Sequence, residues 1–352
     1  MRPRFSSLKG CFLILSLVPV SVVVAHHSTA EYDSDPTQVT IEGVITSIRW
    51  ANPHIEFVIT ETKDAGETQE WVLGEPSAIA MKNHNISPSL FTVGSKVRVY
   101  GAISRRREGR MVGYNFLLLG SSLEVIMVPD RSPGPLWSNN VVGLSASDIY
   151  SATGPLPNDR SALFRVWSWE PVPEFWMFRD PDYYPMTKQA RAAFDAWNID
   201  DLSDNTVLRC EPPGMPAAMG NPHPMEFVDL GDVIEIRMEE FDQVRRIHMT
   251  DAQAPSEIPA SLLGYSVGRW EGKALIVETS RVSARYLTRN GVPLSRDARI
   301  EERFALNAQN GRLNYRLIVT DPENLTSPFV QDLVWNWHEG AYRQRYDCQV
   351  VD

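Results

Sequence analysis

Two adjacent histidines, His26 and His27, directly follow an apolar leader and are the sharpest chemical signal in the sequence. If the leader is removed after Ala25, His26 carries the free amino terminus, and its amino nitrogen and its ring can chelate one metal ion. A second imidazole completes a T-shaped set of nitrogen ligands, which suits Cu(II). We expect His54, just after a tight Asn-Pro turn, to supply this imidazole, with His27 as the alternative.

Other outcomes at this terminus stay open. If cleavage leaves Ala25 as the first residue, His27 becomes the third. The amino, amide and imidazole nitrogens of such a terminus can coordinate copper or nickel. The remaining alternative is a polar terminus that binds no metal, with His54 hydrogen-bonded locally. The sequence therefore predicts a copper site at this terminus and leaves its ligand set open among these histidines.

An enzyme site in the second half of the chain is the alternative to metal binding. Polar side chains on several expected strands can converge there if they face a barrel interior: Arg245, His248, Glu301, Arg303, Tyr315 and Asp321. Side chains alternate along a strand, so Arg245 and His248 lie on opposite faces. The sequence does not say which face is inside, and the other interpretation is a set of salt bridges on the outside of the sheet.

No motif assigns a reaction to these residues. Phosphate loops and dinucleotide fingerprints are absent from the sequence. Residues 264–268 have the letters of a Gly-x-Ser-x-Gly nucleophile elbow, but Ser266 lies within a strand-like run and not at a strand-to-helix turn. We therefore expect binding without turnover.

The leader predicts the compartment. Basic residues precede an apolar run at 11–24, which has the length of a signal-peptide core and is too short for a comfortable membrane span. An uncleaved anchor is the alternative. We expect a signal peptide at 1–25, cleavage near Ala25, and a periplasmic or secreted protein without a membrane span.

Cleavage leaves two cysteines, Cys210 and Cys348. Because an exported chain meets oxidising conditions, we expect a disulfide between them. A pair of reactive thiols is the alternative.

Composition limits the partners. The chain of 352 residues has a formal net charge of −10, which argues against nucleic acid, because such binding depends on clustered Lys and Arg. A hydrophobic fraction of 43% supports folded cores. A metal ion or a small molecule is the expected partner, and the oligomeric state stays open.

Residues 26–128 have the pattern of a small β domain. The expected strands, with a short helix at 76–83 between the third and the fourth, are 38–50, 54–60, 69–73, 96–102 and 111–119. Five strands with a helix in this position are typical of an OB-like barrel.

Three stretches of this domain resemble a known family. They are 25–28 (Ala-His-His-Ser), 43–54, which ends in Asn-Pro-His, and 93–97. Together they resemble DUF6152, a family of exported bacterial domains of unknown function. The resemblance covers about residues 25–120 and implies a fold and an exported location, but no activity.

Residues 129–186 form a Pro- and aromatic-rich segment that we expect to be a linker and a strap. Its prolines argue against a regular helix or a central strand. We expect the strap to pack across a barrel or a domain junction. Lining a ligand cleft is the alternative.

Residues 187–352 predict a short helix capped by Thr187 and then a run of hairpins. The expected strands are 225–229, 233–238, 244–249, 265–270, 274–279, 299–306, 313–320, 333–337 and 341–348. Consecutive strands with short turns favour an antiparallel meander barrel, lipocalin-like in outline, over a two-sheet sandwich. About residues 185–350 also resemble uncharacterised exported bacterial proteins, which again implies no activity.

The sequence thus predicts an all-β protein of two barrels with little helix. The leading function is the binding of copper or of a small apolar ligand in the cell envelope. A small-molecule enzyme is the alternative, and a protein-interaction module that uses the strap is the third.

Overall fold

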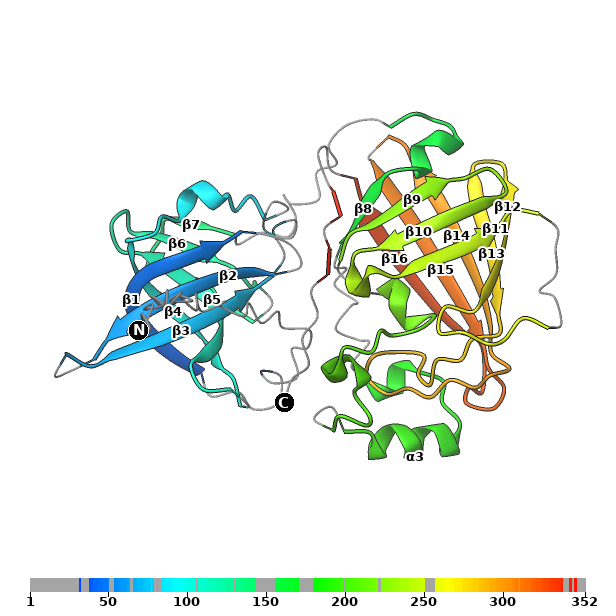
Figure 1. Ribbon diagram of the computed structural model, residues 1–352, viewed down its shortest axis with the longest axis horizontal. Helices are drawn as coiled ribbons and strands as arrows, with labels where there is room; N and C mark the ends of the chain where they lie inside the picture. Colours follow the sequence, from blue (N-terminus) through cyan, green and yellow to red (C-terminus); the bar gives the residue numbers. More distant parts are fainter. Residues whose placement is uncertain are drawn as a thin grey trace, which may run out of the picture.

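The structure is a computed structural model in which two β-barrels lie side by side (Figure 1). The residues that it describes are 32, 38–50, 54–63, 66–76, 78, 81, 84–105, 107–129, 131–143, 156–170, 180–198, 201–220, 223–250, 257–309, 311–337, 342–343 and 345–346. Among these residues, no helix is long and apolar enough to cross a membrane.

The first barrel has five strands, which are β1 (Gln38–Arg49), β2 (Ile55–Thr62), β3 (Thr68–Glu75), β4 (Lys96–Ile103) and β5 (Arg110–Leu118). β1 pairs with both β2 and β4, and a parallel pairing of β3 with β5 closes the barrel. Two short strands, β6 (Leu123–Ile126) and β7 (Val141–Val142), continue the sheet beyond β5. This topology confirms the predicted OB-like barrel.

Alternation along the strands builds the core of the first barrel. In β2, Ile55, Phe57 and Ile59 are fully buried, while the residues between them are partly exposed. Phe57 and Phe116 pack with ring centroids 5.2 Å apart at the centre of this core. The period of two that predicted the strand therefore also predicted which face is inside.

Nine strands close the second barrel. They are β8 (Val166–Glu170), β9 (Met225–Asp229), β10 (Val233–Met238), β11 (Val244–His248), β12 (Tyr265–Glu271), β13 (Ala274–Ser280), β14 (Arg299–Asn307), β15 (Arg312–Thr320) and β16 (Phe329–Asn336). The predicted meander is confirmed except between β11 and β12, which pair in parallel. A parallel pair cannot be joined by a tight hairpin, so this step departs from the meander.

The strand β8 corrects one expectation. It comes from the segment expected to be a linker and strap, yet it pairs with β16 and β9 and closes the barrel. No proline lies between Pro157 and Pro171, so none interrupts the strand, and Trp167 is fully buried in the core. The strand expected at 341–348 does not form at its described residues, 342–343 and 345–346. As limits of separate domains, 26–128, 129–186 and 187–352 stay predictions.

Side chains fill the interior of the second barrel. Phe304, Tyr315 and Trp335 pack with ring centroids between 4.8 and 6.1 Å apart, and all three are buried. The predicted helix is present as α3 (Lys188–Ala196), and Thr187 Oγ1 accepts a hydrogen bond from the Ala190 amide at 3.2 Å. The helix lies at one end of this barrel (Figure 1).

Candidate functional site

Two histidines from different barrels meet at the junction between them. His54 directly precedes β2 of the first barrel, and His223 lies two residues before β9 of the second. Their ring centroids are 5.9 Å apart, and the ring planes are nearly perpendicular, at 85°. His54 was predicted as a metal ligand, but with His26 or His27 as its partner and not with His223.

A backbone carbonyl fixes the protonation of His54. Its Nδ1 lies 3.1 Å from the carbonyl oxygen of Glu75, at the end of β3. Since a carbonyl oxygen only accepts, Nδ1 carries the proton and the lone pair is on Nε2. Histidines that bind metals are commonly oriented by such a bond, so Nε2 of His54 is suited to coordinate an ion.

Two buried carboxylates flank His223, which is itself buried. Its Nδ1 is 4.0 Å from Glu239 Oε1, and its Nε2 is 4.0 Å from Glu240 Oε1. These distances are too long for hydrogen bonds, so the contacts are electrostatic. Arg289 forms an ion pair with Glu240. Two carboxyl groups and the guanidinium of Arg289 therefore lie around His223 among the described residues.

The backbone between β10 and β11 is strained where it supports these carboxylates. Phe241 and Asp242 have φ values of 55° and 49°, in the left-handed region that residues with a Cβ rarely adopt. Each such residue costs roughly 1–2 kcal/mol. Strain of this kind concentrates at functional sites.

Tyr346, near the end of the chain, closes one side of the cluster. Its ring centroid lies 5.5 Å from that of His223 and 4.9 Å from that of Phe241. Burial of the phenol raises the pKa of Tyr346 well above its usual value, and the nearby Glu240 raises it further. The Tyr346 side chain is therefore uncharged at neutral pH and bounds one side of the site.

A buried acid lies behind His54. The Glu75 side chain accepts a hydrogen bond from the Gly113 amide at 2.8 Å through Oε1, and Oε2 has no hydrogen-bond partner among the described residues. Burial raises the pKa of Glu75 to about 8, against a smaller opposing effect of the Gly113 bond. Its carboxyl is therefore mostly protonated at neutral pH, which adds no charge beside His54.

Several predicted site residues lie outside the described part of the chain. His26, His27 and Cys348 are among them, so the amino-terminal copper site and the Cys210–Cys348 disulfide stay predictions. Cys210 follows a short helical turn in the second half, with a φ of 60°. Within the described residues, no three His, Cys, Asp or Glu side chains are grouped so that they could hold a metal ion.

The interior of the second barrel contains a saturated polar network. The Arg245 guanidinium donates to both carboxylate oxygens of Glu302, and the Tyr315 hydroxyl donates to Glu302 Oε1 at 2.8 Å. Arg245 also donates to the hydroxyls of Ser266 and Thr279. Although burial opposes the charged form, the pairing with Glu302 raises the pKa of Arg245. The network is a closed internal ion pair.

The structure separates the other predicted enzyme residues from this network. Glu301 is exposed, His248 lies on the outer face and stacks on Tyr265 with centroids 4.6 Å apart, and Arg303 pairs with Glu271 at the surface. Asp321 accepts hydrogen bonds from Ser295 elsewhere in the barrel. Of the six predicted residues, Arg245 and Tyr315 share one cluster, and its carboxylate is Glu302 instead of Glu301.

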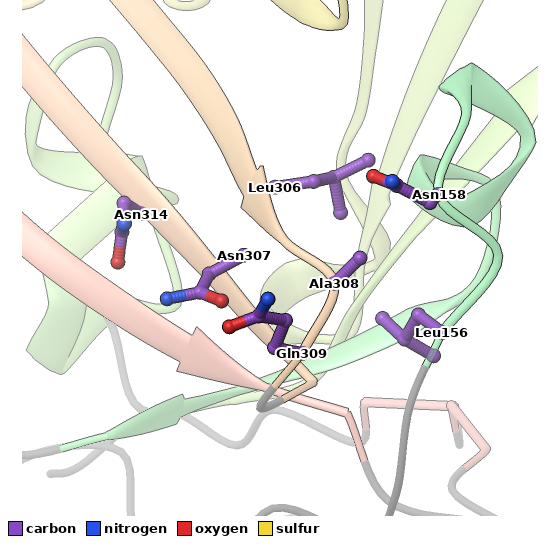
Figure 2. A pocket seen from close by; sticks show the side chains of 7 residues that line it. All are labelled: Leu156, Asn158, Leu306, Asn307, Ala308, Gln309 and Asn314. Atoms are coloured by element: carbon purple, nitrogen blue, oxygen red, sulfur yellow. The ribbon is translucent and has the colours of Figure 1, made fainter.

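A hollow of about 440 Å³ lies at the tip of the β14–β15 hairpin (Figure 2). Its lining combines carboxamides with a few apolar side chains: Leu156, Asn158, Leu306, Asn307, Ala308, Gln309 and Asn314. It shares no residue with the histidine junction or with the Arg245 network.

Sequence reasoning missed His223, Glu239, Glu240 and Tyr346. A signal for the first was present, because the tripeptide Asn-Pro-His occurs at 52–54 and again at 221–223. The structure brings the histidines of both copies together. No comparable pattern marks the two glutamates or the tyrosine.

Residues 15–115 match the profile of a family of unknown function, DUF6152. The match confirms the predicted resemblance of this region. It includes His26, His27 and His54, and it ends before the second barrel, so His223 lies outside it. No curated protein and no solved structure matches the chain.

Proposed function

We propose that this protein binds a transition-metal ion, best fitted by copper, at the junction of its two barrels. The observation that carries the proposal is the approach of His54 to His223, with ring centroids 5.9 Å apart. Two imidazoles on one ion, each with a metal–nitrogen distance of about 2.0 Å, have centroids at most about 6.3 Å apart. The observed separation therefore suits an ion with the two rings on nearly opposite sides.

The ligand chemistry favours copper over harder ions. Imidazole and amine nitrogens in a planar arrangement suit Cu(II), whereas magnesium and calcium take oxygen ligands. The hydrogen bond that orients His54 and the two carboxyl groups beside His223 support a bound cation. We propose that His26, with its free amino group after export and cleavage near Ala25, completes the set, with His27 as the alternative.

Export also underlies two further parts of the proposal. We infer that the protein works in the periplasm or outside the cell, and that a Cys210–Cys348 disulfide forms there. The saturated Arg245 network supports a structural role for the interior of the second barrel. No observation favours turnover or a small apolar ligand there over metal binding at the junction.

The test is a Cu(II) titration of the processed protein, which begins at His26. We expect one tightly bound ion, and we expect His54→Ala and His223→Ala each to weaken it at least about tenfold. His248→Ala is the matched control, because His248 stacks on the outside of the second barrel. Equal copper affinity in the unchanged protein and in the His54→Ala, His223→Ala and His248→Ala variants would contradict the proposed site. The His26→Ala variant tests the amino-terminal ligand separately.

A further inference from the structure

We propose that the hollow at the tip of the β14–β15 hairpin binds a neutral small molecule with several hydroxyl groups, of which a sugar is the common example. The hollow shares no residue with the histidine junction, so this inference does not depend on metal binding. Its volume of about 440 Å³ is within the range of small-molecule sites, roughly 300–1,000 Å³.

Four carboxamide side chains supply the polar part of the lining. They are Asn158, Asn307, Gln309 and Asn314. A carboxamide has N–H donors and a carbonyl acceptor, and a hydroxyl group both donates and accepts, so the two kinds of group can pair in either direction. Figure 2 shows Asn314 on one side of the view, Asn158 on the other, and Asn307 and Gln309 between them. The lining therefore offers hydrogen bonds from several directions.

Most of these carboxamide groups are available to a ligand. Asn307, Gln309 and Asn314 are exposed, and their side chains form no hydrogen bond with another described residue. Asn158 differs, because its Oδ1 accepts a hydrogen bond from the Lys273 ammonium at 2.8 Å, which leaves its N–H groups as donors. The polar groups of the hollow are thus unlike the Arg245 network, whose members bond to one another.

The charge of the lining favours a neutral ligand. Among the described residues, no charged side chain lines the hollow. A charged ligand would lose contact with water there without gaining a counter-charge, which is unfavourable. Lys273 lies outside the lining and is exposed on the turn between β12 and β13, so water weakens the effect of its charge.

Apolar side chains complete the lining, and they suit the carbon skeleton of a sugar. Leu156 is buried in the core of the second barrel, and Leu306 and Ala308 are partly buried against it. Sugars expose C–H groups between their hydroxyls, and contact between these groups and apolar side chains removes both from water. A wholly apolar ligand would instead displace water from the carboxamides without replacing its hydrogen bonds.

The surroundings of the hollow are held in place before any ligand binds. β14 and β15 pair along their whole lengths. The Leu156 amide donates to the Ala308 carbonyl at 2.9 Å, which ties the segment that carries Leu156 and Asn158 to the hairpin. Further along that segment, Arg160 Nε donates to the Gly272 carbonyl at 2.9 Å. A lining that is already ordered loses less conformational entropy on binding.

The test is a binding survey by saturation-transfer NMR with the metal-free protein. The neutral probes are glucose, galactose, N-acetylglucosamine, maltose and trehalose, and glucuronate is the charged counterpart of glucose. We expect at least one neutral sugar to give a saturable signal with a dissociation constant in the millimolar range or below. No signal from any of the five, or tighter binding of glucuronate than of all five, would overturn the proposal.

Variants assign the bound sugar to the hollow. Asn307→Ala combined with Asn314→Ala removes two of the available carboxamides and should weaken binding at least about tenfold. Gln331→Ala is the matched control, because Gln331 is partly exposed on β16 of the same barrel and does not line the hollow. It should leave the affinity unchanged. Equal affinity in the double variant and the unchanged protein would overturn the assignment.

A second measurement needs no variant. When the sugar is added to the unchanged protein, the side-chain amide resonances of Asn307 and Gln309 should shift, while that of Gln331 stays in place. Shifts that spare both Asn307 and Gln309 would overturn the site even if the sugar binds.

Discussion

His54 and His223 face each other with ring planes at 85°, although one belongs to the first barrel and the other to the second. Each lies at the entry to a strand, in the non-strand residues before β2 and β9. An ion coordinated by both histidines would also link the two barrels to each other. Binding and the relative position of the two barrels are therefore linked in this account.

Removing one partner of the buried Arg245–Glu302 pair should strongly destabilise the second barrel. Glu302→Leu leaves the guanidinium buried without its counter-charge, and we expect it to lower the free energy of unfolding by about 3–5 kcal/mol. Arg245→Met combined with Glu302→Leu should cost less than Glu302→Leu alone, because no uncompensated charge remains. Urea denaturation measures both.

The control for this pair is on the surface. Glu278 pairs with Arg269 at 2.7 Å, but both side chains are more than half exposed. Glu278→Gln should change the unfolding free energy by less than about 1 kcal/mol. A similar loss in Glu278→Gln and Glu302→Leu would contradict the importance given to burial.

The first barrel should lose stability in acid through His84. Burial lowers the pKa of His84 to about 4, from an ordinary value of 6.5. The unfolded chain therefore takes up a proton first as the pH falls, so stability is fully present above 6.5 and is lost progressively towards 4. We expect His84→Gln to remove about 3 kcal/mol of this loss. Unfolding curves between pH 8 and 4 measure it, and an unchanged pH dependence would count against a buried neutral His84.

The predicted disulfide can be tested by counting thiols. The processed, exported protein, denatured without reductant, should show no free thiol, and reduction should release two, from Cys210 and Cys348. Because the bridge would close a long loop, reduction should lower stability by about 4–5 kcal/mol in the chain-entropy account. Two thiols that react before reduction would exclude the bridge.

Most of the strands could be predicted because side-chain alternation and hairpin turns depend on residues that are neighbours in the sequence. Alternation in β2 and the Asn-Gly dipeptide at 310–311 are enough to predict a buried face and a hairpin. β8 was missed because it has only five residues in a segment with prolines on both sides, and its partners β16 and β9 are distant in sequence. The parallel pairing of β11 with β12 is likewise a long-range property.

The site was less predictable for the same reason. His54 could be proposed from its own neighbourhood, but its approach to His223 depends on how two barrels pack. The burial of Glu239, Glu240 and Tyr346 depends on that packing too. Identical tripeptides indicate similar local turns and do not show that the turns will meet.

The most direct test of the central claim is the electron spin resonance spectrum of the Cu(II)-loaded protein with ¹⁵N-labelled histidine. We expect nitrogen couplings from imidazoles that include His54 and His223, so that His54→Ala and His223→Ala each remove one coupled nitrogen while His248→Ala removes none. A copper spectrum that is identical in His223→Ala and the unchanged protein would contradict a site shared by the two barrels.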